Sequence, residues 1–427
     1  MLLWSAQAIS QTAQNAIWFA LMVLIEETTR STTQVGIAII SFILPSVVFT
    51  IPAGVLVDRV DKRLVLVTTN WLRAGAVLGY IFFSETPALI FTVTFVFSVI
   101  SQFFLPAEAA MIPALVGKRR LLTANSLFNL TFTLSQLVGM VFMAPIVIKL
   151  FGIGPLFLSI AVLFGICGFL VLALPGRTAI RSSAEPSPDG GKAIHRFLTD
   201  LHDTWIFITS DRLATMSMVV LTCGATLSLV TAMLAPRFVV AVLGIRADDT
   251  VYVLAPAGFG MALGATVISR LSRWVPKELV TVVGVAGVGV GLLMLAVVSP
   301  LWGIIFQLLA LLANPEQLPR VVSLVTVVML VAGATGLFLS TMIISSQTIL
   351  QEQAPVASRG RIFAVQIMLG NLASILPLVG VGELADLLGV SYVLVLLALA
   401  MFALAYVAMR TYRARIWGEH RLSAPPR

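Results

Sequence analysis

Charged residues are scarce in this chain, and that scarcity excludes an ordinary soluble domain. Only 11% of the 427 residues are Asp, Glu, Lys or Arg, whereas 59% are hydrophobic, and soluble domains carry about 25% charged residues. Cysteine is equally rare, with 2 residues in the whole chain. Because Cys167 and Cys223 both lie inside apolar stretches, we expect neither a structural disulfide nor a metal site.

Signatures of enzymes are missing as well. The sequence contains no HExxH, GxSxG or Walker pattern, and its 3 histidines all fall in segments expected outside the membrane. We therefore expect no enzymatic activity, no cofactor, no metal, and no nucleotide or nucleic-acid partner.

Long apolar runs are what the chain has in abundance. A hydrocarbon core roughly 30 Å thick needs about 20 apolar residues per spanning helix, and unpaired backbone groups in lipid are too costly for any open structure. The sequence predicts an all-α membrane protein with twelve transmembrane helices, at about 4–25, 34–57, 64–83, 87–107, 122–148, 153–174, 213–235, 251–269, 279–298, 321–348, 362–383 and 390–409. The first run has no basic leader or small-residue cleavage site, so we expect a retained span, not a signal peptide.

The basic residues predict the orientation. We assign most of the 27 Lys and Arg residues to the side of the N-terminus, and only Arg30, Lys149, Arg237, Arg246 and Arg320 to the other side. By the positive-inside rule, both termini are then cytoplasmic, as in a protein of the plasma (inner) membrane. The net charge of +8 indicates this topology and contact with the lipid bilayer.

The middle of the chain predicts a division into two halves. Residues 175–191 have the Pro-, Ser- and Gly-rich composition of a linker, and residues 194–208 have the apolar spacing of a helix lying on the membrane surface. The alternative is that 194–208 begin the seventh span. The predicted domains are six-helix bundles at 1–174 and 212–410, a cytoplasmic linker at 175–211 and a basic tail at 411–427.

One apolar stretch is too short to span. Residues Trp302 to Leu312 lie between Pro300 and Pro315, and a crossing there would place the basic C-terminal tail outside. We expect an external helix, either interfacial or re-entrant, bounded by these prolines.

The charged turn after the second apolar run reads Gly54-Val-Leu-Val-Asp58-Arg59-Val-Asp61-Lys62-Arg63. It resembles the cytoplasmic loop signature of the major facilitator superfamily, G-x-x-x-D-R-x-G-R-R, with Asp61 in place of the usual glycine. A weak echo runs from Gly264 to Arg273 in the second half. Further glycines there, such as Gly258 and Gly260, are expected to allow close helix packing; since no strand precedes them, they are not a nucleotide fingerprint.

Two other loops narrow the resemblance. Pro106-Ala107-Glu108 and Arg359-Gly360-Arg361 are similar to loops of the enterobactin-exporter and macrolide-efflux branch. The chain departs from that branch at Gln14-Asn15, where Gly-Asp is common. Of the antiporter signature it keeps only Gln136-Leu-Val-Gly139 and a later Pro145.

The resemblance implies a secondary transporter that works by alternating access, most like exporters of bulky, largely apolar drugs or siderophores. In the family, the Asp58 position caps the helix that begins near Arg359 and Arg361. The expected gating residues are Gly54, Asp58, Arg59, Lys62, Arg63, Arg73, Glu108, Arg359 and Arg361. The alternative is that the basic residues only set the topology.

Polar side chains recur on single faces of the apolar runs and predict contacts with a small-molecule substrate. The candidates are Gln11, Asn15, Trp18, Gln102, Asn129, Gln136, Ser345, Gln366 and Asn371; the alternative is hydrogen bonding between helices. If protons drive transport, Glu108 is the first candidate carrier, and Arg73 is the one clearly buried base. An importer, a transporter of lipid-like substrates and a non-transporting scaffold remain alternatives, and we expect a monomer.

Overall fold

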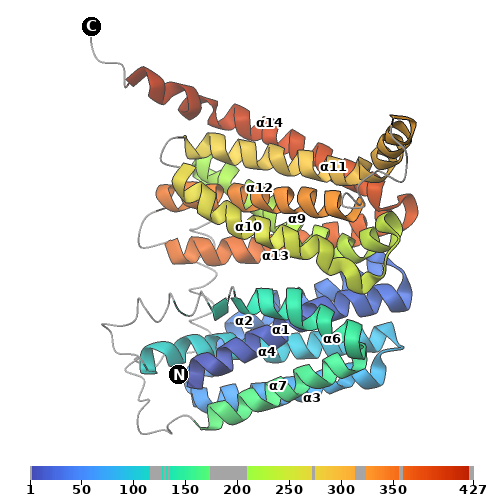
Figure 1. Cartoon of the computed structure of the whole chain (residues 1–427). Helices are drawn as coiled ribbons and strands as arrows, with labels where there is room; N and C mark the ends of the chain where they lie inside the picture. Colours follow the sequence, from blue (N-terminus) through green and yellow to red (C-terminus); the bar gives the residue numbers. More distant parts are fainter. Residues whose placement is uncertain are drawn as a thin grey trace. The chain divides into compact units, whose positions relative to one another are not determined.

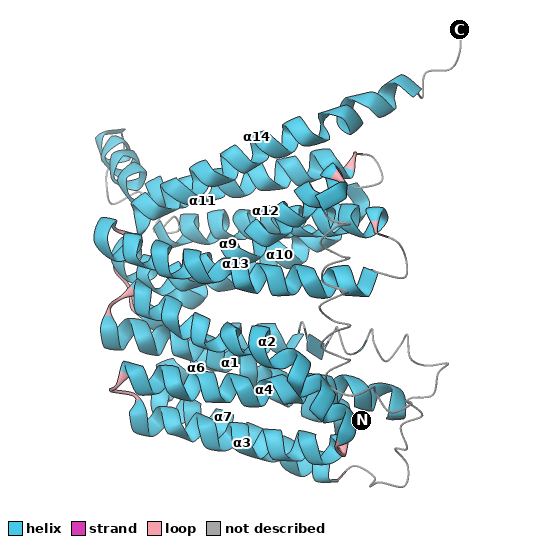
Figure 2. Cartoon of the chain, turned by 180° about the vertical axis from the view of Figure 1, so that it is seen from behind, coloured by secondary structure: helices cyan, strands magenta, loops and turns pink. Residues whose placement is uncertain are grey.

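The computed structural model describes residues 2–115, 127, 131–132, 134–173, 209–271, 275–312, 324–354 and 359–422. In this part of the chain the elements are helices joined by short turns, with no strand (Figure 2). The predicted linker and surface helix at 175–208 and the candidate Asn129 lie outside the described residues. The domain boundaries near 174 and 212 therefore stay predictions.

The chain divides into two compact units, Met1–Thr199 and Asp200–Arg427. The first contains α1 (Leu2–Thr29), α2 (Thr32–Arg59), α3 (Lys62–Phe83), α4 (Pro87–Leu115), the π-helix η2 (Leu137–Met143), α6 (Ala144–Phe151) and α7 (Ile153–Leu172). The second contains α9 (Arg212–Leu243), the 3₁₀ helix η3 (Ala247–Thr250), α10 (Val251–Leu271), α11 (Lys277–Leu312), α12 (Leu324–Gln353), α13 (Arg359–Leu388) and α14 (Val390–Leu422). Within each unit the long helices run side by side (Figure 1).

The predicted number of spans is confirmed. Among the described residues, 12 helical segments are long and apolar enough to cross a membrane, from Leu3–Thr29 to Val390–Arg413. Helices satisfy their backbone hydrogen bonds internally, which is the condition for crossing lipid.

Short polar or glycine signals set the helix ends. Ser31 and Asp211 accept hydrogen bonds from the amides of Gln34 and Leu213 at the starts of α2 and α9, because the first amides of a helix lack partners within it. The turn between α6 and α7 uses Gly152 at φ 89°, a conformation that favours glycine.

The helix boundary predicted at Pro300 is wrong, whereas the external placement of Trp302–Leu312, interfacial or re-entrant, stays a prediction. The segment is helical, but it continues α11, which runs from Lys277 to Leu312 with Pro300 inside it. At 1.5 Å per residue this helix is roughly 54 Å long, and its candidate span ends at Val298. Proline lacks only one amide donor and bends a helix without necessarily ending it, so the stretch extends α11 beyond the span.

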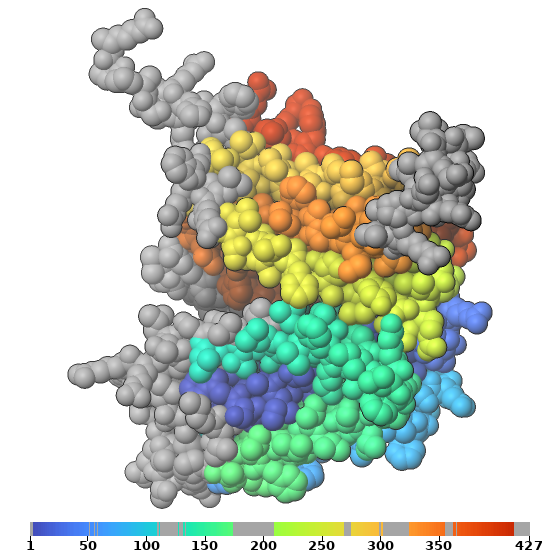
Figure 3. Space-filling model, viewed as in Figure 1, coloured from blue at the N-terminus to red at the C-terminus, as the bar shows by residue number. Residues whose placement is uncertain are grey.

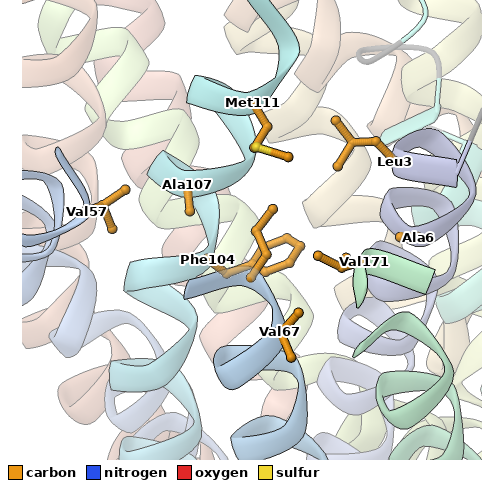
Figure 4. Close-up of a cluster of buried hydrophobic side chains, with 9 residues drawn as sticks. Leu3, Ala6, Val57, Val67, Phe104, Ala107, Met111 and Val171 are labelled. Carbon is orange, nitrogen blue, oxygen red and sulfur yellow. The ribbon is translucent and has the colours of Figure 1, made fainter. Parts of the chain in front are cut away.

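The core of the first unit draws on five of its helices. Side chains of Leu3 and Ala6 (α1), Val57 (α2), Leu66 and Val67 (α3), Phe104, Ala107 and Met111 (α4) and Val171 (α7) form one buried cluster. Figure 4 shows those labelled pointing toward a common centre. This cluster fixes the ends of α2, α3 and α4, where the charged turn and Glu108 lie.

Glycines set the packing of the second unit. A Cβ on Gly260 would overlap the carbonyl oxygen of Gly333, and one on Gly336 would overlap that of Ala257. Close approach of this kind brings α10 against α12, whose atoms meet on the face seen in Figure 3 (yellow and orange). Close packing is thus confirmed at Gly260, and also at Gly264, Gly287 and Gly291, but not at Gly258, where a Cβ would meet nothing within 4 Å.

Candidate functional site

A buried arginine lies at the centre of the candidate site in the first unit. Arg73 is only 2% exposed and stands on the buried face of α3 with Leu66, Asn70 and Val77, which recur at intervals of three or four residues. This spacing turns the guanidinium toward the neighbouring helices and away from lipid.

Three other helices complete the surroundings of Arg73. Its Nη2 donates to Asn70 Oδ1 at 2.9 Å, and Nη1 lies 3.5 Å from the side-chain oxygen of Gln14 on α1. The guanidinium carbon lies 4.0 Å from the ring centroid of Phe104 on α4 and 4.7 Å from that of Phe164 on α7. Two amide acceptors and two ring faces therefore hold the cation within the bundle.

Glu108 adds a carboxyl group to this cluster. It lies one helical turn after Phe104 on α4, is 1% exposed, and interacts electrostatically with Arg73. Within the described part of the chain, neither of its side-chain oxygens has a hydrogen-bond partner. A buried carboxylate without a hydrogen-bond donor costs several kcal/mol. The Glu108 side chain is therefore stabilised at this position either by binding a proton or by moving closer to a basic side chain.

Cys167 closes the cluster on the α7 side. Its Sγ lies 3.3 Å from the backbone oxygen of Ala6 and is buried. These contacts give the thiol a packing role. It links α7 to α1 directly beside the arginine.

The charged turn contains residues that hold helix ends. Asp61 is the N-cap of α3 and accepts a hydrogen bond from the Arg63 amide at 2.9 Å. The Arg63 side chain donates to the carbonyl oxygens of Val171 (3.3 Å) and Leu172 in the last turn of α7. Since helix C-termini have unpaired carbonyls and a partial negative charge, Arg63 ties the turn to α7.

The remaining gating candidates have fewer contacts. Arg59 is exposed at the end of α2, Lys62 is half-buried at the start of α3, and Gly54 has room for a Cβ. The side chains of Asp58, Arg359 and Arg361 lie outside the described part of the structure, although their backbones belong to α2 and α13. The predicted contact between Asp58 and the start of α13 stays a prediction.

The polar face predicted on α1 packs against the fifth span. Gln11 is buried, Asn15 Nδ2 donates to the Gln11 carbonyl at 2.8 Å, and the Trp18 ring lies 4.4 Å from that of Phe42. Two residues that sequence reasoning did not select make the junction. Ser135 donates to the Ala8 carbonyl at 3.0 Å, and a Cβ on Gly139 would overlap the Thr12 carbonyl.

The segment that approaches α1 so closely is a π-helix. The stretch that keeps Gly139 of the antiporter signature forms η2, which begins directly after the exposed Gln136. Single π turns occur often at functional sites. In the sequence, the incomplete antiporter signature marked this segment as unusual, but it did not indicate that the segment forms a π-helix.

The other substrate candidates are dispersed. On α4, the side-chain oxygen of Gln102 lies 3.2 Å from the Thr50 hydroxyl. In the second unit, Gln366 and Asn371 are half-buried on α13, and Gln366 Oε1 has no partner among the residues described. The expectation that these residues contact a substrate stays a prediction.

Ser345 lines a cavity of about 240 Å³ in the second unit. The lining residues are Ala265 and Ile268 (α10), Lys277 and Val280 (α11), and Ile344, Ser345 and Thr348 (α12). The Thr281 hydroxyl donates to Ser345 Oγ at 2.8 Å, and Ser345 donates to the Thr341 carbonyl at 2.7 Å.

Comparison with known proteins identifies the family. A family model described as the Major Facilitator Superfamily matches residues 3–376. The chain belongs to this superfamily. The predicted resemblance is therefore confirmed, and the chain is a membrane transporter by family and fold, a family that is not typically enzymatic.

Two curated members match shorter stretches. The chain is 27% identical over 118 residues to the uncharacterized MFS-type transporter YkuC of Bacillus subtilis, which covers 27% of each chain. It is 29% identical over 145 residues to macrolide efflux protein A of Streptococcus pyogenes, covering 32% of this chain and 36% of that protein. The matches thus span about a quarter to a third of these relatives' lengths.

Solved structures share the whole fold at low identity. The nucleoside transporter NupG has a TM-score of 0.73 and 15% identity, over 96% of this chain and 98% of that one. A POT family transporter bound to a thioalcohol-conjugated peptide has a TM-score of 0.71 and 12% identity, over 97% and 96% of the chains. At this identity the likeness shows the major facilitator fold alone.

Proposed function

We propose that this protein exports a bulky, largely apolar small molecule by alternating access, driven by the proton gradient. The substrate class is supported by the side chains of the candidate stripes, which are polar but uncharged, such as Gln11, Asn15 and Gln102. A cavity without fixed charge suits an apolar solute better than a dicarboxylate or sugar phosphate. The direction is supported by the partial match to a macrolide efflux protein.

The observation that carries proton coupling is the buried Arg73–Glu108 cluster. Glu108 is 1% exposed, and within the described residues its oxygens have no hydrogen-bond donor. Intramembrane ionisable residues commonly mark proton relays. In our proposal, Glu108 takes up a proton in one conformation, and in the other it loses the proton and pairs with Arg73.

Extrusion of a panel of dyes and macrolides from energised cells tests this function. The wild type should lower intracellular accumulation of at least one compound, and collapse of the proton gradient should abolish that effect. Uptake in place of extrusion would favour an importer, and no movement of any compound in liposomes would favour a scaffold.

Replacement of Glu108 separates coupling from folding. Glu108→Gln keeps the shape and removes the titrating group, so energised extrusion should fall by roughly tenfold or more if this carboxyl carries the coupled proton. Downhill exchange of the same compound should persist, because the binding residues are unchanged. Equal loss of both activities would indicate a structural role and contradict the proposal.

The gate requires its own variant. Asp58→Asn removes the charge of the predicted latch while leaving the first-unit cluster intact, and we expect slower transport with unchanged binding. A shift from 1:99 to 99:1 between two states needs about 5.5 kcal/mol, more than one exposed ion pair supplies. A partial defect is therefore expected, and full activity would argue against a latch at Asp58.

A further inference from the structure

The cavity in the second unit has a mostly apolar lining with one lysine at its edge. Four of its lining residues are apolar, namely Ala265, Ile268, Val280 and Ile344, and among the lining residues that the structure describes only Lys277 is charged. It lies where α10 and α12 end and α11 begins, so it belongs to one end of the helix bundle. An apolar chamber with a single cation at its rim suits an amphipathic anion.

The polar lining other than Lys277 is already paired. Ser345 accepts from Thr281 and donates to the Thr341 carbonyl, and Thr348 donates to the Ile344 carbonyl at 2.8 Å. These hydroxyls hold the wall of the cavity and leave little donor capacity for a ligand. Recognition of an incoming group therefore falls to the Lys277 ammonium.

Lys277 is held by a contact that is easily exchanged. Its ammonium pairs with Glu352 of α12, and the two side chains are 32% and 50% exposed. Partly exposed ion pairs contribute little to stability. Glu352 is absent from the lining of the cavity, so a phosphate inside it would compete with Glu352 for the same ammonium.

The size and charge of the surroundings define the ligand further. The volume of about 240 Å³ equals the liquid volume of about eight water molecules and is below the range for a whole drug-sized ligand. It admits a phosphate group and the first part of an apolar chain. In the sequence, residues 270–277 include three basic residues, Arg270, Arg273 and Lys277, and Glu278 follows directly. Basic pockets between helices at the cytoplasmic side of a membrane attract anionic lipid head groups.

We propose that the cavity lined by Ala265, Ile268, Lys277, Val280, Ile344 and Ser345 binds the phosphate of an anionic amphiphile, which replaces Glu352 as the partner of Lys277. The phosphate can come from a membrane lipid or from a soluble compound. This site is distinct from the Arg73–Glu108 cluster, and binding can be measured without any transport assay.

Two variants that break the same ion pair provide the test. Full-length protein in a nonionic detergent is titrated with phosphatidylglycerol, and the dissociation constant is obtained from the shift of the melting temperature. Lys277→Gln should weaken binding about tenfold, because a charge-assisted hydrogen bond is lost. Glu352→Gln should strengthen binding, because the competing carboxylate is gone.

Controls keep the result interpretable. Lys149→Gln removes an exposed lysine at the end of α6 in the other unit and should leave binding unchanged, whereas Ala265→Leu should weaken it by filling the cavity. Inorganic phosphate alone is the second titrant: a response to phosphatidylglycerol only supports a lipid source, and an equal response to both supports a soluble one. Equal changes in Lys277→Gln and Glu352→Gln, or no change in either, would overturn the proposal.

Discussion

Asp61 and Arg63, in the charged turn between α2 and α3, hold helix ends. Asp61, which stands where the family usually has glycine, caps α3 through the Arg63 amide. Arg63 in turn binds the last carbonyls of α7. An N-cap aspartate and an arginine on a helix C-terminus both satisfy backbone groups that helices leave unpaired. These two residues therefore stabilise the turn, whatever Asp58 contributes to gating.

Replacement of the cap should lower stability without stopping transport. Asp61→Ala removes the acceptor for the Arg63 amide and should cost about 1 kcal/mol in the free energy of unfolding, whereas Asp61→Asn keeps an acceptor and should cost little. Thermal unfolding in detergent measures both variants. If the two lose the same stability, the side chain does not act as a cap.

At the scale of elements, glycine positions determine how closely the helices of the second unit approach. Gly260 and Gly258 lie on the same helix two residues apart, yet only Gly260 meets another backbone, that of Gly333 on α12. Both conformations are helical, so backbone flexibility does not distinguish them. The difference is the space available for a Cβ.

This difference predicts opposite effects of the same substitution. Gly260→Ala forces α10 away from α12 and should cost about 1–3 kcal/mol, as overpacking does. Gly258→Ala adds a methyl group to open space and should be neutral or stabilise by up to about 1 kcal/mol, since alanine favours helix. Melting temperatures of the two purified variants provide the measurement. A loss at position 258 as large as that at 260 would show that glycine flexibility matters more than packing.

At the scale of the whole molecule, the number of crossings determines the sidedness of the termini. The described residues contain 12 candidate spans, and an even number returns the chain to the side on which it started. The basic residues predict that this side is the cytoplasm. The α3–α4 turn, with the exposed Glu85, then lies outside. The exposed Arg413, which ends the last candidate span within α14, lies inside.

Labelling with a membrane-impermeant maleimide checks this topology. In intact cells, Glu85→Cys should react several-fold faster than the unsubstituted protein. The background reaction of the unsubstituted protein is low because Cys167 is buried and Cys223 is half-buried. Arg413→Cys should react only after the cells are opened. Reaction of both variants in intact cells would contradict an even number of spans.

The spans could be predicted from sequence because each depends on its own residues. In lipid, a backbone must satisfy its hydrogen bonds within the segment, so hydropathy and length suffice. Local composition does not predict the end of α11: Pro300 indicates a helix boundary before Trp302–Leu312, although α11 continues through it. A proline removes one amide donor, and local composition does not indicate whether the helix resumes.

The candidate site was only partly predictable. Arg73 and Glu108 stood out as ionisable groups in or beside apolar runs. The side chains that surround Arg73 could not be predicted in this way, because Gln14, Phe104 and Phe164 come from three other helices and contact Arg73 only after the helices pack. The π-helix over Leu137–Met143 was missed as well. The capping role of Asp61, by contrast, is a contact with the amide two residues along the chain and could have been predicted from the sequence.

The amino-acid sequence by itself determined that this protein is a helical membrane protein and, through its charged loops, its superfamily. The first property follows from short-range chemistry, namely the cost of exposing a backbone or a charge to lipid, and the second from the resemblance of those loops to the family signature. Tertiary structure alone decided which side chains surround Arg73, which glycines let α10 meet α12, and where Lys277 borders a cavity. These contacts join helices distant in the chain, and close packing sets them through the shapes of all the neighbours together.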